Sequence, residues 1–166
     1  LKDVEKLAEE CSPTSIIHCA AYVPKSNVEY NDSLSAEKSL FMLENLLLVF
    51  DCPIIFISSM TVYGFVSDRA VKENNVLNPV SMYGHGKMKA EQILIKSNRP
   101  CLSVRIPGLY GGNRNSGLVH NLIYSLKNNN IPSLPQEPIL WAGMDVSDVA
   151  QIILRICRLD WSDLRA

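Results

Sequence analysis

The sequence predicts an α/β protein built around a parallel β-sheet. Short apolar segments alternate along the chain with segments of helical periodicity, and one apolar segment, residues 54–57, is apolar at every position. A strand that is apolar on both faces is typical of a buried strand in a parallel sheet. Strands that alternate with helices predict βαβ units, and right-handed crossovers place the helices on both faces of the sheet.

The first half of the chain contains two predicted helices and two predicted strands. Residues 2–11 and 34–50 have apolar side chains at helical spacing, and a proline soon follows each segment. Residues 15–20 and 54–57 are short apolar runs and predict strands. Each strand therefore follows a helix, as a parallel sheet requires.

The second half continues the same alternation after a polar loop over residues 64–79. The expected elements are a helix over 81–97, a strand over 101–106, a turn-rich stretch over 107–112, and helices over 117–128 and 146–159. The expected apolar positions of these helices and of the helix at 34–50 are Leu40, Leu43, Leu47, Phe50, Ala90, Ile93, Leu94, Val149, Ile152, Ile153 and Ile156.

Composition argues against several classes of protein. The formal net charge is -1, which gives no general attraction to nucleic acid or to anionic membranes. The richest apolar run, residues 40–57, contains Glu44, Asp51 and Pro53, and so predicts no membrane span. The charged N-terminal residues do not resemble a signal peptide, and we expect a cytoplasmic protein.

The five cysteines and three histidines have no ligand-like spacing. Five is an odd number, and no pair of cysteines is separated by two residues. We expect reduced and mostly buried thiols, and no metal site.

Three loops are expected to carry the chemistry. In an open parallel sheet, ligands bind beyond the carboxyl ends of the strands. Residues 19–24, 58–64 and 107–114 follow the three predicted strands, and each loop contains small residues that let a ligand approach the backbone.

Tyr83 and Lys87 form a candidate acid/base pair. They are four residues apart near the start of a predicted helix, so their side chains share one face. A nearby ammonium favours the phenolate and would lower the pKa of the tyrosine. Such a tyrosine can exchange a proton with a substrate hydroxyl. The spacing alone is common in helices, but the surrounding motifs strengthen the assignment of Tyr83 and Lys87 as a catalytic pair.

Four motifs in order resemble the extended short-chain dehydrogenase/reductases, in the NAD-dependent epimerase/dehydratase family. Members commonly read V-I-H-x-A-A, S-S-x-x-V-Y-G, Y-G-x-S-K and R-x-x-x-x-Y-G. The matching residues here are 16–21, 58–64, 83–87 and 105–111. The resemblance implies a Rossmann-like doubly wound parallel sheet that is partial, comprising its central and C-terminal half. Residues 1–166 would form a single partial NAD(P)-binding domain, with about 111–145 leading into the substrate-binding region.

The resemblance assigns roles to individual residues. The catalytic triad falls on Ser59, Tyr83 and Lys87. Tyr83 would transfer the proton, Lys87 would hold the nicotinamide ribose and lower the pKa of Tyr83, and Ser59 would hydrogen-bond the reacting oxygen.

Further residues are implied at the cofactor and the substrate. The implied contacts with NAD or NADP, besides Tyr83 and Lys87, are Ala20, Ala21, Tyr22, Ser58, Pro107 and Gly108. Ala20, Ala21 and Tyr22 could equally pack at a strand end, and packing is the stronger interpretation of Ser58. Thr61 and Arg114 are candidates for substrate binding, with Arg114 suited to phosphate or equally to a solvated loop.

The sequence also departs from the family pattern. The glycine-rich loop that holds the pyrophosphate is absent, so we expect that the chain starts inside a longer one and that these residues alone bind no NAD(H). Residues 35–39 replace the common N-V-x-G-T helix, and Gly108 replaces an asparagine. Met60 and Thr61 stand where the sugar-nucleotide 4,6-dehydratases carry acidic residues, which argues against that chemistry.

The leading functional hypothesis is an NAD(P)-dependent epimerase or reductase that acts on a nucleotide sugar. Hydride transfer would be coupled to proton transfer by Tyr83. The alternatives are a non-catalytic relative that binds a dinucleotide as a sensor or scaffold, or an inactive fragment. The oligomeric state is left open by the sequence. Many relatives pair through a four-helix bundle, and the helices at 34–50 and 81–97 have enough apolar surface for a homodimer of this kind.

Overall fold

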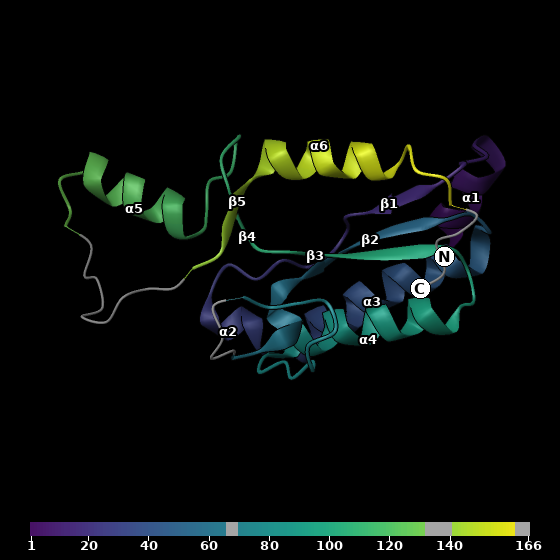
Figure 1. The fold of residues 1–166 in the computed structure, drawn as a ribbon, viewed down its shortest axis with the longest axis horizontal. Coiled ribbons are helices and arrows are strands. Elements are labelled where there is room, and N and C mark those ends of the chain that lie inside the picture. Colours follow the sequence, from purple (N-terminus) through teal and green to yellow (C-terminus); the bar gives the residue numbers. More distant parts are fainter. Residues whose placement is uncertain (66–69, 132–140, 162–166) are drawn as a thin grey trace. The chain divides into compact units, whose positions relative to one another are not determined.

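The computed structural model describes residues 1–65, 70–131 and 141–161 (Figure 1). The chain divides into two compact units, each described here by itself. The first comprises Leu1–Arg105 together with Asp160 and Trp161, and the second comprises Ile106–Leu159.

The first unit contains the central sheet and the helices that cover it. Its strands lie in the order β1-β2-β3, and β1 pairs with β2 in parallel, with Ile16 opposite Ile54 and His18 opposite Phe56. The elements are α1 (Lys2–Glu10), β1 (Ile16–His18), α2 (Asn27–Tyr30), α3 (Ser33–Val49), β2 (Ile54–Ser59), the 3-10 helix η1 (Met60–Tyr63), α4 (Met82–Lys96) and β3 (Cys101–Ile106).

The core of this unit forms where α3 and α4 pack against β2. The two helices lie side by side on one face of the sheet (Figure 1). Burying such apolar side chains is the main favourable contribution to folding. The buried cluster consists of Leu43, Ile54, Phe56, Ala90, Leu94 and Cys101, with Ile16, Leu40 and Leu47 packed against it.

Side-chain caps fix where the helices of the first unit begin. Asp32 accepts a hydrogen bond from the Leu34 amide at the start of α3, and Ser81 accepts one from the Gly84 amide at the start of α4. Such caps satisfy amides that have no partner within the helix. The cap at Ser81 places Tyr83 in the first turn of α4.

The second unit is a small parallel strand pair with two helices. Its elements are β4 (Gly108–Tyr110), α5 (Leu118–Lys127), β5 (Gly143–Asp145) and α6 (Val146–Ile156). Strands β4 and β5 pair in parallel, with Gly108 opposite Gly143 and Tyr110 opposite Asp145. Asp145 caps α6 by accepting a hydrogen bond from the Ser147 amide.

The predicted α/β class with parallel strands is confirmed, and the sheet is partial. The segments that the sequence did not predict are α2, η1, β4 and β5. They have three or four residues each, which is too short for apolar periodicity to be recognised. Strands β4 and β5 also depend on each other for pairing, since they come from segments about 35 residues apart along the chain.

The prediction that the cysteines are mostly buried was wrong. All five thiols are free, but only Cys101 is buried, and Cys11 and Cys19 are exposed. Cys11 lies just beyond α1, and Cys19 follows the last residue of β1, where the chain leaves the packed sheet.

Candidate active site

Ser59 ends β2 at the carboxyl edge of the sheet. It has only 9% of its surface exposed, and it caps η1. Its Oγ accepts hydrogen bonds from the Thr61 amide (3.2 Å) and the Thr61 hydroxyl (3.0 Å). The two hydroxyls proposed to face the substrate are thus held together at the turn where β2 ends.

Tyr83 reaches this turn from the first turn of α4. The Tyr83 hydroxyl lies close to the Ser59 side chain, and the ring of Tyr30 meets the Tyr83 ring edge-on at 5.6 Å between centroids. Burial raises the pKa of Tyr83 to about 12, with a smaller contribution from the Tyr30 phenol, while the interaction with Ser59 lowers it. The phenol is therefore the dominant form near neutral pH.

Lys87 lies one turn further along α4 and is 7% exposed. Its Nζ donates a hydrogen bond of 2.7 Å to the carbonyl oxygen of Ile57. The ammonium also lies 4.7 Å from the ring centroid of Phe56 and 5.7 Å from that of Tyr83. Burial lowers the pKa of Lys87 to about 8, and interactions with Cys19 and Glu91 act in the opposite direction.

The structure does not show the expected lowering of the Tyr83 pKa by Lys87. We predicted that the ammonium would lower the pKa of the phenol, whereas the pKa of Tyr83 is raised. The physical reason is that burial penalises the phenolate, and the ammonium is directed at the Ile57 carbonyl.

His18 is a buried residue of this site that the sequence did not single out as functional. It ends β1, is 4% exposed and stacks on Phe56 at 5.8 Å between ring centroids. Its Nε2 has no hydrogen-bond partner among the described residues. Burial, together with the positive charge of Lys87, lowers the pKa of His18 to about 4.

A pocket beside Tyr83 and Lys87 has small side chains on its walls. Such residues let a ligand approach the backbone closely. The lining residues are Ala20, Ala36, Ser39, Leu40, Phe56, Tyr83, Gly86, Lys87 and Ala90. The structure thus brings Ala20 together with two of the predicted catalytic residues.

The other residues predicted at the cofactor have various surroundings. Tyr22 is exposed, its amide donates to the Ser39 hydroxyl, and the Lys38 ammonium lies over its ring. Ala21 is half-buried. Ser58 is 1% exposed and donates its hydroxyl to Glu91 at 2.5 Å, a contact that agrees with the packing interpretation of this residue.

Pro107, Gly108 and Arg114 belong to the second unit. A Cβ on Gly108 would lie 2.5 Å from the Trp141 ring, so only glycine fits beneath this indole. Arg114 lines a pocket within this unit, together with Tyr110, Gly111, Gly112, Ser116, Val119, His120 and Ile123. The roles of Pro107, Gly108 and Arg114 stay predictions.

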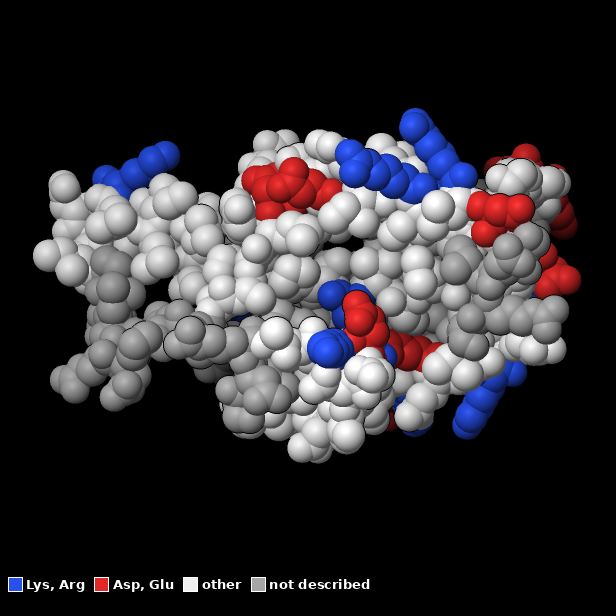
Figure 2. Space-filling view, in the orientation of Figure 1, with Lys and Arg blue, Asp and Glu red and all other residues white. Residues whose placement is uncertain are grey.

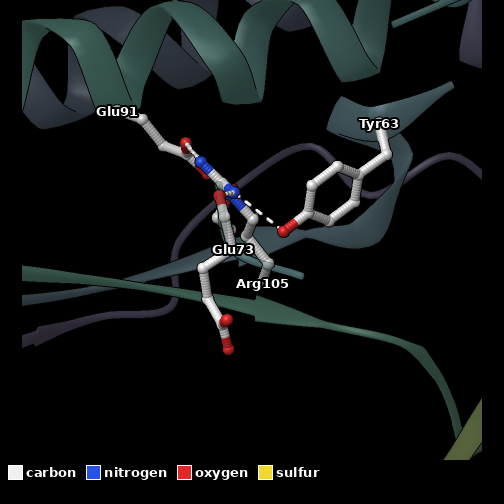
Figure 3. Close-up of polar contacts among 5 residues, drawn as sticks. Tyr63, Glu73, Glu91 and Arg105 are labelled. Carbon is white, nitrogen blue, oxygen red and sulfur yellow. Dashed lines mark hydrogen bonds and ion pairs between the residues drawn. The ribbon is translucent and has the colours of Figure 1, made fainter. Parts of the chain in front are cut away.

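The sequence analysis did not predict a network of charged and polar side chains that lies next to the site. The Arg105 guanidinium lies between the carboxylate of Glu91 and the hydroxyl of Tyr63 (Figure 3). The sequence held one signal for it: Glu91 is four residues beyond Lys87 and therefore shares its helix face. Arg105 was noticed only as part of a motif.

Positive and negative side chains are interspersed on the face drawn in Figure 2. Among the described residues, no helix is both long and apolar enough to cross a membrane. In the same part of the chain, no group of three or more His, Cys, Asp or Glu side chains is placed to hold a metal ion.

Residues 1–133 match the family of the RmlD substrate binding domain. The chain belongs to this family. The match covers every residue of the candidate site in the first unit, including Ser59, Tyr83 and Lys87. The resemblance to epimerases and dehydratases is thereby confirmed at the level of the family.

Curated relatives of this family member include the methionine adenosyltransferase 2 subunit beta proteins. The proteins of Xenopus laevis and Xenopus tropicalis are 29% and 30% identical to it over 111 residues, or 65% of this chain. The aligned region is 33% of each relative, so the chain spans about a third of their length.

Solved structures with the same fold include three proteins at 18–22% identity. UDP-glucuronic acid 4-epimerase from Bacillus cereus, solved with UDP-glucuronic acid and NAD, has a TM-score of 0.80 over 98% of this chain and 54% of its own. RMD from Pseudomonas aeruginosa, complexed with NADPH, has a TM-score of 0.78 over 93% of this chain and 57% of its own. DesIV, a dTDP-glucose 4,6-dehydratase from Streptomyces venezuelae, has a TM-score of 0.81 over 94% of this chain and 52% of its own.

Proposed function

We propose that this chain is the proton-transfer part of an NAD(P)-dependent epimerase or reductase that acts on a nucleotide sugar. The observation that carries the proposal is the meeting of Ser59, from the end of β2, with Tyr83 and Lys87, from the start of α4. The solved UDP-glucuronic acid 4-epimerase and dTDP-glucose 4,6-dehydratase of the same fold support the substrate class.

The residues that line the pocket suit the ribose end of a nicotinamide cofactor. Ala20, Ala36 and Gly86 leave room for a close approach, while the hydroxyl of Tyr83 and the ammonium of Lys87 provide polar groups. The chemistry that such a cofactor supplies is reversible hydride transfer. Either NAD or NADP is compatible with these residues.

In the proposed reaction, each side chain of the triad has one task. The Tyr83 hydroxyl exchanges its proton with the substrate hydroxyl or carbonyl oxygen, and Ser59 donates a hydrogen bond to that same oxygen. Lys87 holds its positive charge on the Tyr83 side of the pocket, 5.7 Å from the ring. A pKa of about 12 keeps Tyr83 protonated near neutral pH, and any motion of the ammonium toward the phenol would favour proton removal.

The test uses the full-length protein with NAD or NADP and a panel of UDP- and dTDP-sugars. Tyr83→Phe should lower kcat by about 100-fold or more, because general acid–base catalysis contributes that much. Tyr124→Phe is the matched control, since Tyr124 is 62% exposed and lies on α5 in the second unit. Turnover of Tyr83→Phe within a few-fold of wild type would refute the assignment.

A second candidate is a non-catalytic subunit of methionine adenosyltransferase. The identity of 29% with methionine adenosyltransferase 2 subunit beta from Xenopus laevis favours it. Co-purification of the full-length protein with a methionine adenosyltransferase catalytic subunit, combined with cofactor binding but no turnover of any nucleotide sugar, would support this candidate over the first.

A further inference from the structure

Glu91 continues the helix face that carries Tyr83 and Lys87. The three residues are spaced by four along α4, so each lies about one turn beyond the last. Glu91 is 4% exposed, which is rare for a carboxylate unless it is paired. Its surroundings therefore decide what it does for the site.

The Glu91 carboxylate is bound from two strands. Its Oε1 accepts a hydrogen bond of 2.5 Å from the Ser58 hydroxyl on β2 and one of 3.0 Å from Arg105 Nε on β3. Its Oε2 accepts from Arg105 Nη2 at 2.8 Å and from Nε at 3.2 Å. This two-pronged arrangement fixes the orientation of both side chains.

The Arg105 guanidinium extends the network to the turn that follows Ser59. Its Nη1 donates to the Tyr63 hydroxyl and to the Glu73 carbonyl oxygen, each at 2.8 Å, and its carbon lies 5.0 Å from the centroid of the Tyr63 ring (Figure 3). Tyr63 belongs to η1, the 3-10 helix that Ser59 caps.

Helix α4 is thus joined to the end of β2 by two polar links one turn apart. Lys87 donates to the carbonyl oxygen of Ile57, and Glu91 accepts from the hydroxyl of Ser58. The next residue of β2 is Ser59, and the preceding turn of α4 carries Tyr83. A shift of the helix along the strand would separate Tyr83 from Ser59.

We propose that Glu91 is a positioning residue for the candidate site, held by Arg105 and Ser58 so that Tyr83 and Lys87 stay in register with Ser59. The proposal rests on the proposed function for its catalytic consequence. Its structural consequence, the placement of Lys87 beside a carboxylate, can be measured without any substrate.

The first measurement follows the ammonium of Lys87 by 13Cε NMR titration in the full-length protein, with Lys87→Arg used to assign the signal. Removing the carboxylate in Glu91→Gln should move the midpoint of this titration toward lower pH by about 0.5 or more. Glu44→Gln is the control, because Glu44 is an exposed carboxylate on the neighbouring helix α3, and it should leave the midpoint unchanged.

The second measurement is kinetic and uses Ser58→Ala, which cuts the link to β2 but keeps the ion pair. We expect kcat to fall by about tenfold with little change in KM, since positioning acts on the reacting geometry. The double variant Glu91→Gln with Arg105→Met removes both charges of the pair. It should regain thermal stability relative to Glu91→Gln alone without regaining kcat.

Three outcomes separate this inference from the proposed function. An unchanged Lys87 midpoint together with wild-type kcat in Glu91→Gln would overturn the inference. A double variant that regains both stability and kcat would also overturn it, because the pair would then be purely structural. If the wild-type protein turns over no nucleotide sugar but Ser58→Ala, which keeps the Glu91 charge, moves the Lys87 midpoint, the proposed function fails and the positioning of Lys87 stands.

Discussion

Lys87 donates a hydrogen bond of 2.7 Å to the carbonyl oxygen of Ile57, which anchors a buried ammonium at the end of the central strand. Burial lowers the pKa of this ammonium to about 8 from an ordinary value of 10.5. Above pH 8 the folded protein has therefore lost a proton that the unfolded chain keeps.

The free energy of unfolding should consequently rise with pH between about 8 and 10, by about 2 kcal/mol. Above pH 10 the trend reverses, since the unfolded chain then loses the tyrosine proton that folded Tyr83 keeps up to about pH 12. Lys87→Met should abolish the rise, and Lys89→Met, at an exposed position of the same helix, should keep it. Denaturant unfolding at pH 7.5, 9 and 10 measures the effect, and an identical slope in Lys87→Met would contradict it.

His18 should make the protein sensitive to acid. Its pKa is lowered to about 4 in the folded protein, whereas the unfolded chain binds the proton at about 6.5. The unfolded state therefore holds more protons between these values, and stability should fall by about 3 kcal/mol as the pH drops from 6.5 to 4. In His18→Phe this loss should be much smaller, whereas His85→Gln, at an exposed histidine, should behave like wild type.

Ser59 and Thr61 should differ in their effect on catalysis although they are bonded to one another at 3.0 Å. Only Ser59 also influences the pKa of Tyr83, so Ser59→Ala should lower kcat by about 100-fold, as loss of a preorganised donor does. We expect Thr61→Val to cost a few-fold. Steady-state kinetics of the full-length enzyme would show the difference, and equal losses would place the contact with the reacting oxygen on Thr61 as well.

Gly64 should tolerate no side chain. Its φ is +69°, and a Cβ there would lie 1.9 Å from the carbonyl oxygen of Asn78. Gly64→Ala should therefore reduce the free energy of unfolding by at least about 2 kcal/mol. Phe65→Ala, at a neighbouring side chain that is 89% exposed, should change it by less than about 0.5 kcal/mol. Comparable losses in the two variants would show that the backbone at Gly64 adapts.

Helix α3 carries an apolar stripe that fits a homodimer. Leu34, Phe41 and Leu48 are seven residues apart on α3, and each is more than half exposed. Residues at this spacing share a helix face and can pack against a second helix. Phe41→Glu combined with Leu48→Lys should shift the full-length protein from dimer to monomer in sedimentation velocity, and a wild-type monomer would refute the prediction.

Much of the fold was predictable because it depends on local patterns. The strand at residues 54–57 is apolar at every position, and the helix around Ala90 and Leu94 has apolar residues at helical spacing, so either could be recognised without its neighbours. The candidate triad was assigned because Ser59, Tyr83 and Lys87 lie in motifs that resemble those of a known family, and such motifs can be recognised without the fold.

The sequence by itself determined the α/β class, the family and the identity of the candidate triad. Only the tertiary structure decided the pKa values and the contacts of the side chains at the candidate site. The high pKa of Tyr83 and the low pKa values of Lys87 and His18 come mainly from burial by segments distant in the chain. The pairing of Glu91 with Arg105 and Ser58 likewise joins three elements. Desolvation and buried ion pairs depend on which surfaces meet in space, and a linear motif does not specify those contacts.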